Sequence, residues 1–219
     1  MNKNLLSNKI SNLQDAHNTL KRESLGKLAD KFDFIERKAV QSSRLFMIDI
    51  IPYIHRLYYD LPKDSVIRVL DVGIHCGSGT ALLAELHNRQ SYNHLKMVVT
   101  GLDIIDHYEN YIKLCYPSFK FIKKDIFDIP DNEKWDLVIC SHVIEHLKEP
   151  FSFVEKLRKL TNKYALVACP YNETDLRSGH IQTIDDAIIS QLNPLEHHIY
   201  TNFSWRVKGE CLIMIFDAL

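Results

Sequence analysis

Residues 66–80, VIRVLDVGIHCGSGT, decide the fold of this chain. Residues 66–72 are mostly β-branched or aliphatic, which predicts a buried strand. The strand pattern stops at Gly73, and apolar residues recur at helical spacing from about Thr80. Glycines between a parallel strand and a helix let the backbone approach a ligand closely, and the helix N-terminus offers it unpaired N–H groups. The stretch therefore predicts a loop that binds a nucleotide-like cofactor, with an ordinary glycine-rich turn as the alternative.

Strand and helix patterns alternate from this stretch to the end of the chain. The strand patterns cover residues 66–72, 97–103, 119–122, 135–141, 164–169, 197–205 and 211–217. The helix patterns cover residues 80–89, 106–115, 150–161 and 183–192. A short link through Val207 to Glu210 predicts that the last two strands form an antiparallel hairpin. This alternation predicts an α/β fold with a doubly wound sheet.

The first 62 residues have a different pattern. Residues 1–60 contain one glycine and one proline, and two stretches carry apolar residues at helical spacing, one up to Ile35 and one from Leu45 to Tyr58. We therefore divide the chain into a helical cap, residues 1–62, and an α/β domain, residues 63–219. The cap contains aromatic and cationic side chains that would line an acceptor site, cover the edge of the sheet or form a contact in a homodimer: Tyr53, Arg56, Tyr58 and Tyr59.

Composition excludes several classes of protein. A chain of 219 residues with 46% hydrophobic residues can fill the core of one domain with an elaboration. The net charge of −1 argues against a nucleic-acid partner. No apolar run reaches about 18 residues, so we expect no transmembrane helix. Five scattered cysteines, without a C-x-x-C pair, predict reduced thiols in the cytoplasm.

Two further acids follow strands at places where a nucleotide-like ligand would lie. Asp103 ends the strand pattern 97–103, where a carboxylate can accept hydrogen bonds from two ribose hydroxyls, and Ile104 would pack on the base. The alternative role of Asp103 is to cap the next helix. Asp125 and Ile126 follow the next strand pattern, with a plain polar loop as the alternative and Asp128 as a competing acid.

Residues 135–147, WDLVICSHVIEHL, closely resemble motif IV of the class I S-adenosylmethionine (SAM) methyltransferases. Asp71 followed by Gly73, Gly77 and Gly79 resembles a longer form of their motif I. The resemblance covers residues 40–219 and implies SAM as the cofactor. It also implies a seven-stranded, mostly parallel sheet with an antiparallel C-terminal hairpin, to which the N-terminal helical cap is added. The implied cofactor residues are Asp71, Gly73, Gly77, Gly79, Asp103, Ile104, Asp125, Ile126 and Ser141; among them Asp125 would meet the adenine amino group and Ile126 would cover the ring.

Histidines are the candidates for the chemistry. His142, Glu145 and His146 would share one face of a helical turn, and His180 follows the fifth strand in a loop. Some relatives, which resemble small-RNA 2′-O-methyltransferases and ubiquinone-pathway O-methyltransferases, bind a divalent cation through Glu-x-x-Glu-His and a distal histidine. Here His142 stands at the position of the first Glu, and we predict catalysis without a metal. We predict instead a general base, with His180 ranked above His142 and His146 as the third candidate.

The expected reaction is methyl transfer to a small polar acceptor, a hydroxyl of a sugar or of a nucleotide-activated metabolite. The pattern resembles that of methyltransferases in bacterial surface-polysaccharide pathways, at the level of the superfamily only. The alternatives are a metal-assisted RNA 2′-O-methyltransferase, another macromolecule methyltransferase, or a SAM-binding protein without catalysis.

Overall fold

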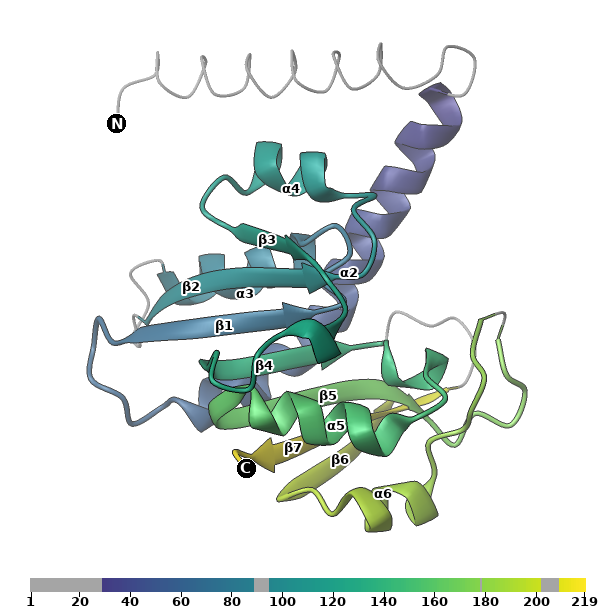
Figure 1. Cartoon of the computed structure of the whole chain (residues 1–219). Helices are drawn as coiled ribbons and strands as arrows, with labels where there is room; N and C mark the ends of the chain where they lie inside the picture. The colour runs from purple at the N-terminus through teal and green to yellow at the C-terminus, as the bar shows by residue number, and fades with distance from the viewer. Residues whose placement is uncertain (1–28, 89–94, 178, 202–208) are drawn as a thin grey trace, which may run out of the picture.

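The structure is a computed structural model that describes residues 29–88, 95–177, 179–201 and 209–219 (Figure 1). The first described element is the long helix α2 (Ala29–Leu57). The other helices are α3 (Ser78–Asn88), α4 (Glu109–Cys115), α5 (Pro150–Lys159) and α6 (Asp186–Leu192), with short 3₁₀ helices η2 (Ile126–Asp128) and η3 (Ile144–His146). The strands are β1 (Val66–Val72), β2 (Lys96–Asp103), β3 (Lys120–Lys123), β4 (Trp135–Ser141), β5 (Thr161–Tyr171), β6 (Glu196–Thr201) and β7 (Glu210–Asp217).

The seven strands form one sheet in the order β3-β2-β1-β4-β5-β7-β6. The first five strands pair in parallel, while β7 runs antiparallel between β5 and β6. The order reverses at β1, so the loops after β1 and β4 diverge, and ligands bind at such a switch point. The predicted doubly wound α/β sheet with an antiparallel C-terminal hairpin is confirmed.

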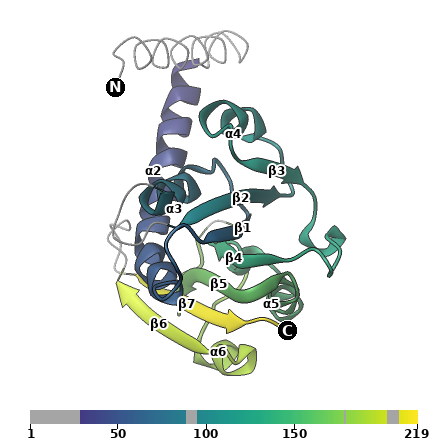
Figure 2. The ribbon, with the colours of Figure 1, turned by 90° about the vertical axis from the view of Figure 1, so that its left-hand side faces the viewer.

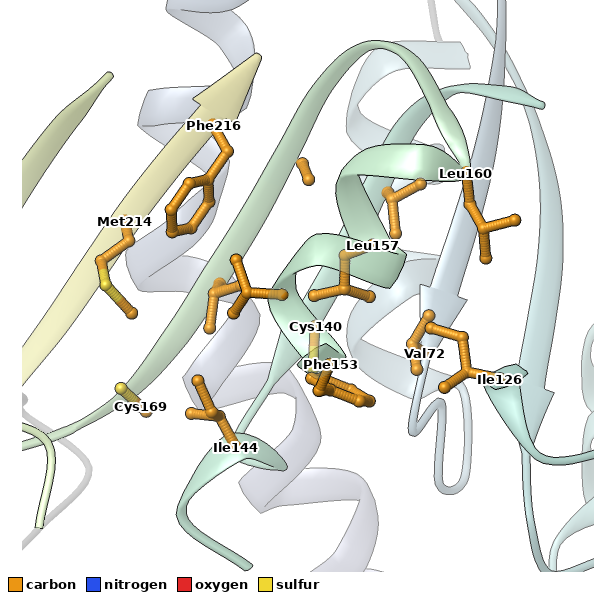
Figure 3. Close-up of a cluster of buried hydrophobic side chains, with 14 of the residues drawn as sticks. Val72, Ile126, Cys140, Ile144, Phe153, Leu157, Leu160, Cys169, Met214 and Phe216 are labelled. Carbon is orange, nitrogen blue, oxygen red and sulfur yellow. The ribbon is translucent and has the colours of Figure 1, made fainter. Parts of the chain in front are cut away.

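Helices cover both faces of the sheet, as Figure 2 shows for α2 and α3 on one face and α5 on the other. Ile50 and Ile54 of α2 and Leu83 of α3 are buried against the first of these faces. The opposite face buries Phe153, Leu157 and Leu160 against Cys140 and Met214, among other residues, as seen in Figure 3. Strands buried on both faces are typical of parallel sheets, which explains their continuous apolar runs.

The N-terminal region differs most from the sequence prediction. Residues 1–28, which hold most of the first expected helical stretch, lie outside the described part. From Ala29 on, the end of the first stretch and the second stretch belong to one helix, α2, with Pro52 inside it. The helix continues past Pro52 because Met47, Ile50 and Ile54 pack against the sheet, and this burial outweighs the lost backbone bond. The boundary near residue 62 stays a prediction.

Other element ends shift by a few residues. The last helix begins at Asp186, three residues later than predicted, because the Asp185 carboxylate caps it by accepting from the Ile188 N–H at 3.0 Å. The fifth strand begins at Thr161 because this residue pairs with Trp135 of β4. Residues 202–205 of the sixth strand prediction lie outside the described residues. In the part of the chain that the structure describes, no helix is long and apolar enough to cross a membrane.

Candidate active site

A cavity of about 760 Å³ lies at the carboxyl ends of β1, β2, β3 and β4. Its walls come from the loops after these strands and from α2. Every residue predicted to hold the cofactor lines this cavity except Gly77 and Gly79; those in the wall are Asp71, Gly73, Asp103, Ile104, Asp125, Ile126 and Ser141. The sequence motifs therefore converge on one cavity although they are spread over 71 positions.

The three glycines that follow β1 have different structural roles. Gly73 has a φ of +76°, and a Cβ atom there would meet Val143 Cγ2 at 2.5 Å. Its N–H donates to the Leu102 carbonyl at 2.8 Å, which ties the loop to β2. Gly79 serves packing instead, because a Cβ atom there would meet the Ser43 carbonyl oxygen of α2 at 2.4 Å. Gly77, also at positive φ (+72°), closes the turn and faces Ile112 rather than the cavity.

Two carboxylates at the strand ends are held in place by backbone N–H groups. Asp103 accepts from the N–H of His75 at 3.2 Å and from that of Ile105 at 3.1 Å. Asp125 caps η2 by accepting from the Phe127 N–H at 3.0 Å through Oδ1. Asp103 does not cap the next helix, α4, whose N-cap residue is Tyr108, whereas Asp125 caps η2; both acids also line the cavity. Each carboxylate oxygen has further lone pairs, so capping does not exclude a ligand.

Two buried polar groups belong to the cavity wall, the Asp71 carboxyl and the Ser141 hydroxyl. Asp71 is buried, and burial raises the pKa of its carboxyl to about 7; the neighbouring Asp103 charge also raises it, while the Thr80 hydroxyl, which donates to Asp71 Oδ2, lowers it. Among the described residues the Ser141 hydroxyl oxygen is buried and has no hydrogen-bond partner. A buried polar atom without a partner in a cavity wall indicates a ligand group that would pair with it.

Helix α2 forms a further wall of the cavity, through residues that the sequence prediction did not single out. Ser42, Ser43, Phe46 and Met47 line the cavity, and the spacing of four between Ser42 and Phe46 and between Ser43 and Met47 places each pair on one face of the helix. That spacing was visible in the sequence, but its partner surface was not.

The aromatic residues expected to line the cavity lie elsewhere on α2 and just beyond its end. Tyr58 is buried, and its hydroxyl donates to the Asp136 carbonyl at 2.8 Å. Arg56 pairs with Glu196 of β6, and Tyr53 contacts His198 with ring centroids 4.9 Å apart. These residues therefore cover the sheet, which was the alternative role given to them.

The predicted histidines occupy different positions relative to the cavity. His142 and His146 line it, whereas His180 is not among its lining residues. His142 has a φ of +56°, its ring stacks on Phe46 at 3.8 Å between centroids, and its Nδ1 lies 3.3 Å from Glu145 Oε1. A histidine in the left-handed region is uncommon and marks a position that surrounding structure over-determines, as at active sites.

Known proteins are similar to this chain in sequence. Residues 44–202 match a family described as "Methyltransferase domain". The ubiquinone biosynthesis O-methyltransferase of Glaesserella parasuis serovar 5 (strain SH0165) is 31% identical over 112 residues, which are 46% of this chain and 43% of that protein. The match thus spans less than half of the length of this relative.

Solved structures share the fold. The magnesium protoporphyrin IX methyltransferase of Synechocystis PCC 6803 with bound S-adenosylhomocysteine has a TM-score of 0.59 at 14% identity, covering 90% of this chain and 89% of that one. The N-methyltransferase NodS of Bradyrhizobium japonicum WM9 has a TM-score of 0.55 at 17% identity, covering 93% and 98%. The family match covers most of the chain, so the chain belongs to the methyltransferase domain family, within the class I SAM-dependent superfamily that its motifs predicted.

Proposed function

We propose that this protein transfers a methyl group from SAM to a small polar acceptor, a hydroxyl of a sugar or of a nucleotide-activated metabolite. The observation that carries the proposal is the single cavity in which Asp71, Asp103, Asp125 and Ser141 meet beside His142. Its volume of about 760 Å³ lies within the range of about 300–1,000 Å³ that small-molecule and cofactor sites occupy.

The cavity residues fit SAM from one end to the other. Asp125 and Ile126 would hold the adenine, Asp103 would accept from the two ribose hydroxyls, and the exposed Ile104 would pack on the base. Asp71 and the unpartnered Ser141 hydroxyl would meet the amino acid end, where positive charge favours the ionised carboxylate. When bound, SAM supplies a methyl group that its positive sulfur has already activated. The protein then has to orient the acceptor and exclude water.

His142 is the best-placed group to take a proton from the acceptor. It follows β4 directly, lines the cavity and lies beside the Glu145 carboxylate, which can orient its ring. This ranking reverses the sequence prediction, which placed His180 first. His142→Ala should lower kcat by about 10²–10⁴ and leave SAM affinity near the wild-type value. A kcat within threefold of the wild-type value would show that His142 is not the general base and only positions the acceptor.

Two observations support this class of acceptor: the name of the relative and two exposed polar residues in the cavity wall. The relative from Glaesserella parasuis is named an O-methyltransferase, which supports a hydroxyl acceptor here. Lys148 and Glu149 lie at the wall of the cavity and are exposed, so they offer hydrogen bonds to a polar acceptor. The near-neutral net charge of −1 does not favour a nucleic acid.

Two measurements test the proposal. Calorimetric titration should show binding of SAM and S-adenosylhomocysteine, and weak or absent binding would contradict the cofactor assignment. Methyl transfer from labelled SAM should then be assayed against sugar phosphates, nucleotide-linked metabolites and RNA, with His142→Ala as the inactive control. Label in the small-molecule pools supports the acceptor class, whereas label in RNA alone would overturn it in favour of the macromolecule alternative.

A further inference from the structure

One stripe of side chains on α2 runs along β6 towards the loop after β4. Side chains at spacings of three and four residues share one face of a helix, and four residues of α2 form this stripe: Phe46, Asp49, Tyr53 and Arg56. Arg56 pairs with Glu196 of β6, and the rings of Tyr53 and His198 lie 4.9 Å apart. One helical turn advances about 5.4 Å and two strand residues about 6.6 Å, so each earlier residue of the stripe meets a residue two positions later in β6.

This alignment places Asp49 opposite Tyr200 of β6. Asp49 lies one turn before Tyr53, and Tyr200 lies two residues after His198 on the half-buried face of the strand. The electrostatics agree with this placement, because burial, then the charge of Cys211 and then that of Asp49 raise the pKa of the Tyr200 phenol. Tyr200 therefore stays neutral and supplies no positive charge to Asp49.

His142 is the neighbour of Asp49 that can carry a positive charge. Phe46, three residues before Asp49 in the stripe, stacks on the His142 ring with centroids 3.8 Å apart and an angle of 27° between the planes. Among the described residues Asp49 Oδ2 is buried and has no hydrogen-bond partner. Burial raises the pKa of the Asp49 carboxyl, and the charge of His142 lowers it. The two side chains thus lie close enough to interact, although Asp49 does not line the cavity.

The His142 ring is therefore held by groups from two separate elements. Glu145 of η3 is buried, and its Oε1 lies 3.3 Å from His142 Nδ1. From α2 come the stacked ring of Phe46 and the carboxyl of Asp49. Strand β5 presents Cys169 in this region, and burial raises the pKa of that thiol, so it stays neutral. A positive His142 ring and the two carboxylates stabilise each other through their charges.

From this arrangement we infer that Asp49 is a positioning residue of the active site, which holds the His142 ring from the side of α2 and stabilises the positive charge that the ring gains. This role rests on the proposed methyl transfer, in which His142 takes the proton of the acceptor hydroxyl. The contact between the two side chains does not rest on it. The sequence did not single out Asp49, because both of its partners follow it at a distance in the chain.

Carbon-13 NMR of the full chain, labelled at the aspartate carboxyls and measured without SAM, tests the contact. The pKa of the Asp49 carboxyl is obtained from its pH titration in the wild type and in His142→Gln, and Asp49→Asn identifies its resonance. This pKa should be higher in His142→Gln, because the variant lacks the positive neighbour that lowers it. The same pKa in both proteins would overturn the inference.

Kinetics test the role of the contact. Asp49→Asn keeps the size of the side chain and removes its charge, so kcat should fall by about tenfold, a part of the roughly 10²–10⁴ that a general base contributes. KM for SAM should stay at the wild-type value, since Asp49 does not line the cavity. Asp60→Asn, an exposed acid just beyond the end of α2, is the matched control and should react as the wild type does.

The outcomes separate this inference from the proposed function. Thermal unfolding confirms that each variant is folded, and the kinetics of Asp49→Asn carry the test if His142→Gln is not. A kcat of Asp49→Asn within twofold of the wild type, or a loss confined to SAM binding, would overturn the role of Asp49 and leave methyl transfer standing. If the wild type methylates no acceptor, the proposed function fails, and the carboxyl titration still decides whether Asp49 holds His142.

Discussion

Carboxylates give this cavity its electrostatic character at the scale of single residues. Asp71 and Asp103 end adjacent strands and lie close enough for the charge of one to raise the pKa of the other. Asp103 is half-buried and accepts hydrogen bonds from two backbone N–H groups, whereas Asp71 is buried. Asp103 is therefore suited to accept hydrogen bonds from neutral hydroxyl groups, and Asp71 is suited to pair with a cationic group.

Removal of the Asp103 side chain tests the ribose assignment. Asp103→Ala should weaken SAM binding by about 2–4 kcal/mol, because two hydrogen bonds to a charged acceptor are lost. Calorimetric titration measures the effect, and Asp103→Asn, which keeps one carbonyl oxygen, should fall between the two. Asp106→Ala is the matched control, since that acid is exposed and pairs with Lys123. Equal SAM affinity in Asp103→Ala and wild type would refute the assignment.

The raised pKa of Asp71 predicts a pH dependence of folding stability. Its pKa of about 7 in the folded state exceeds the ordinary 3.8, so between these values the folded state holds a proton that the unfolded state has released. Stability should therefore fall as pH rises from about 4 to 7, by a total on the order of 4 kcal/mol. Asp71→Asn should remove this slope in urea unfolding, measured without ligand, and should raise stability above pH 7.

An exposed acid provides the comparison for that measurement. Asp60→Asn changes the same functional groups at the surface and should keep the wild-type pH dependence. A pH profile for Asp71→Asn that follows the wild type from about pH 4 to 8 would show that burial of this carboxyl does not control the stability.

The contact between α2 and α3 decides the shape of the cavity at the scale of elements. Gly79, in the first turn of α3, lets the backbone of α2 approach, and its N–H donates to the Ser43 hydroxyl at 2.9 Å. Ser43 and Met47, which touch Gly79 in this way, also line the cavity. Packing between α2 and α3 thus positions one wall of the cavity.

A methyl group at Gly79 should separate these helices. In Gly79→Ala the new Cβ would lie 2.4 Å from the Ser43 carbonyl oxygen and 3.0 Å from Met47 Cβ. Overpacking costs about 1–3 kcal/mol, while alanine favours the helix by about 1 kcal/mol at most, so the net change should be destabilising. Urea unfolding measures it, with Glu85→Ala on the exposed side of α3 as the control. A variant as stable as the wild type would show that α2 gives way without cost.

The cavity belongs to the whole molecule, because α2 and the loops after four strands, β1 to β4, together form its walls. Helix α2 precedes the sheet in the chain, but its buried residues belong to the same hydrophobic cluster as Ile213 and Ile215 of β7. The position of β7 between β5 and β6 makes the end of the chain part of the same core. A ligand in the cavity should therefore stabilise the fold globally.

Thermal unfolding measures this global effect. SAM at about 100 times its Kd should stabilise the protein by about 2.7 kcal/mol, which corresponds to a Tm increase of about 5–10 °C for a domain of this size. The Asp103→Ala variant at the same SAM concentration should show a smaller increase, because its affinity is lower. An unchanged Tm of the wild type at a saturating SAM concentration would contradict a cavity that assembles from all these elements.

The sequence by itself determined the strands, the loop after β1 and the acids at Asp103 and Asp125, because each depends on local periodicity and on the rule that ligands bind at the carboxyl ends of parallel strands. The family resemblance supplied the seven strands and the antiparallel C-terminal hairpin, and the structure supplied the order of the strands. Only the tertiary structure showed that Phe46 covers His142 and that Gly79 serves packing. The resemblance had already grouped His180 with Glu145 and His146, and the structure places their side chains close together. The physical reason is that burial and contact between distant segments arise from packing, which local sequence patterns do not encode.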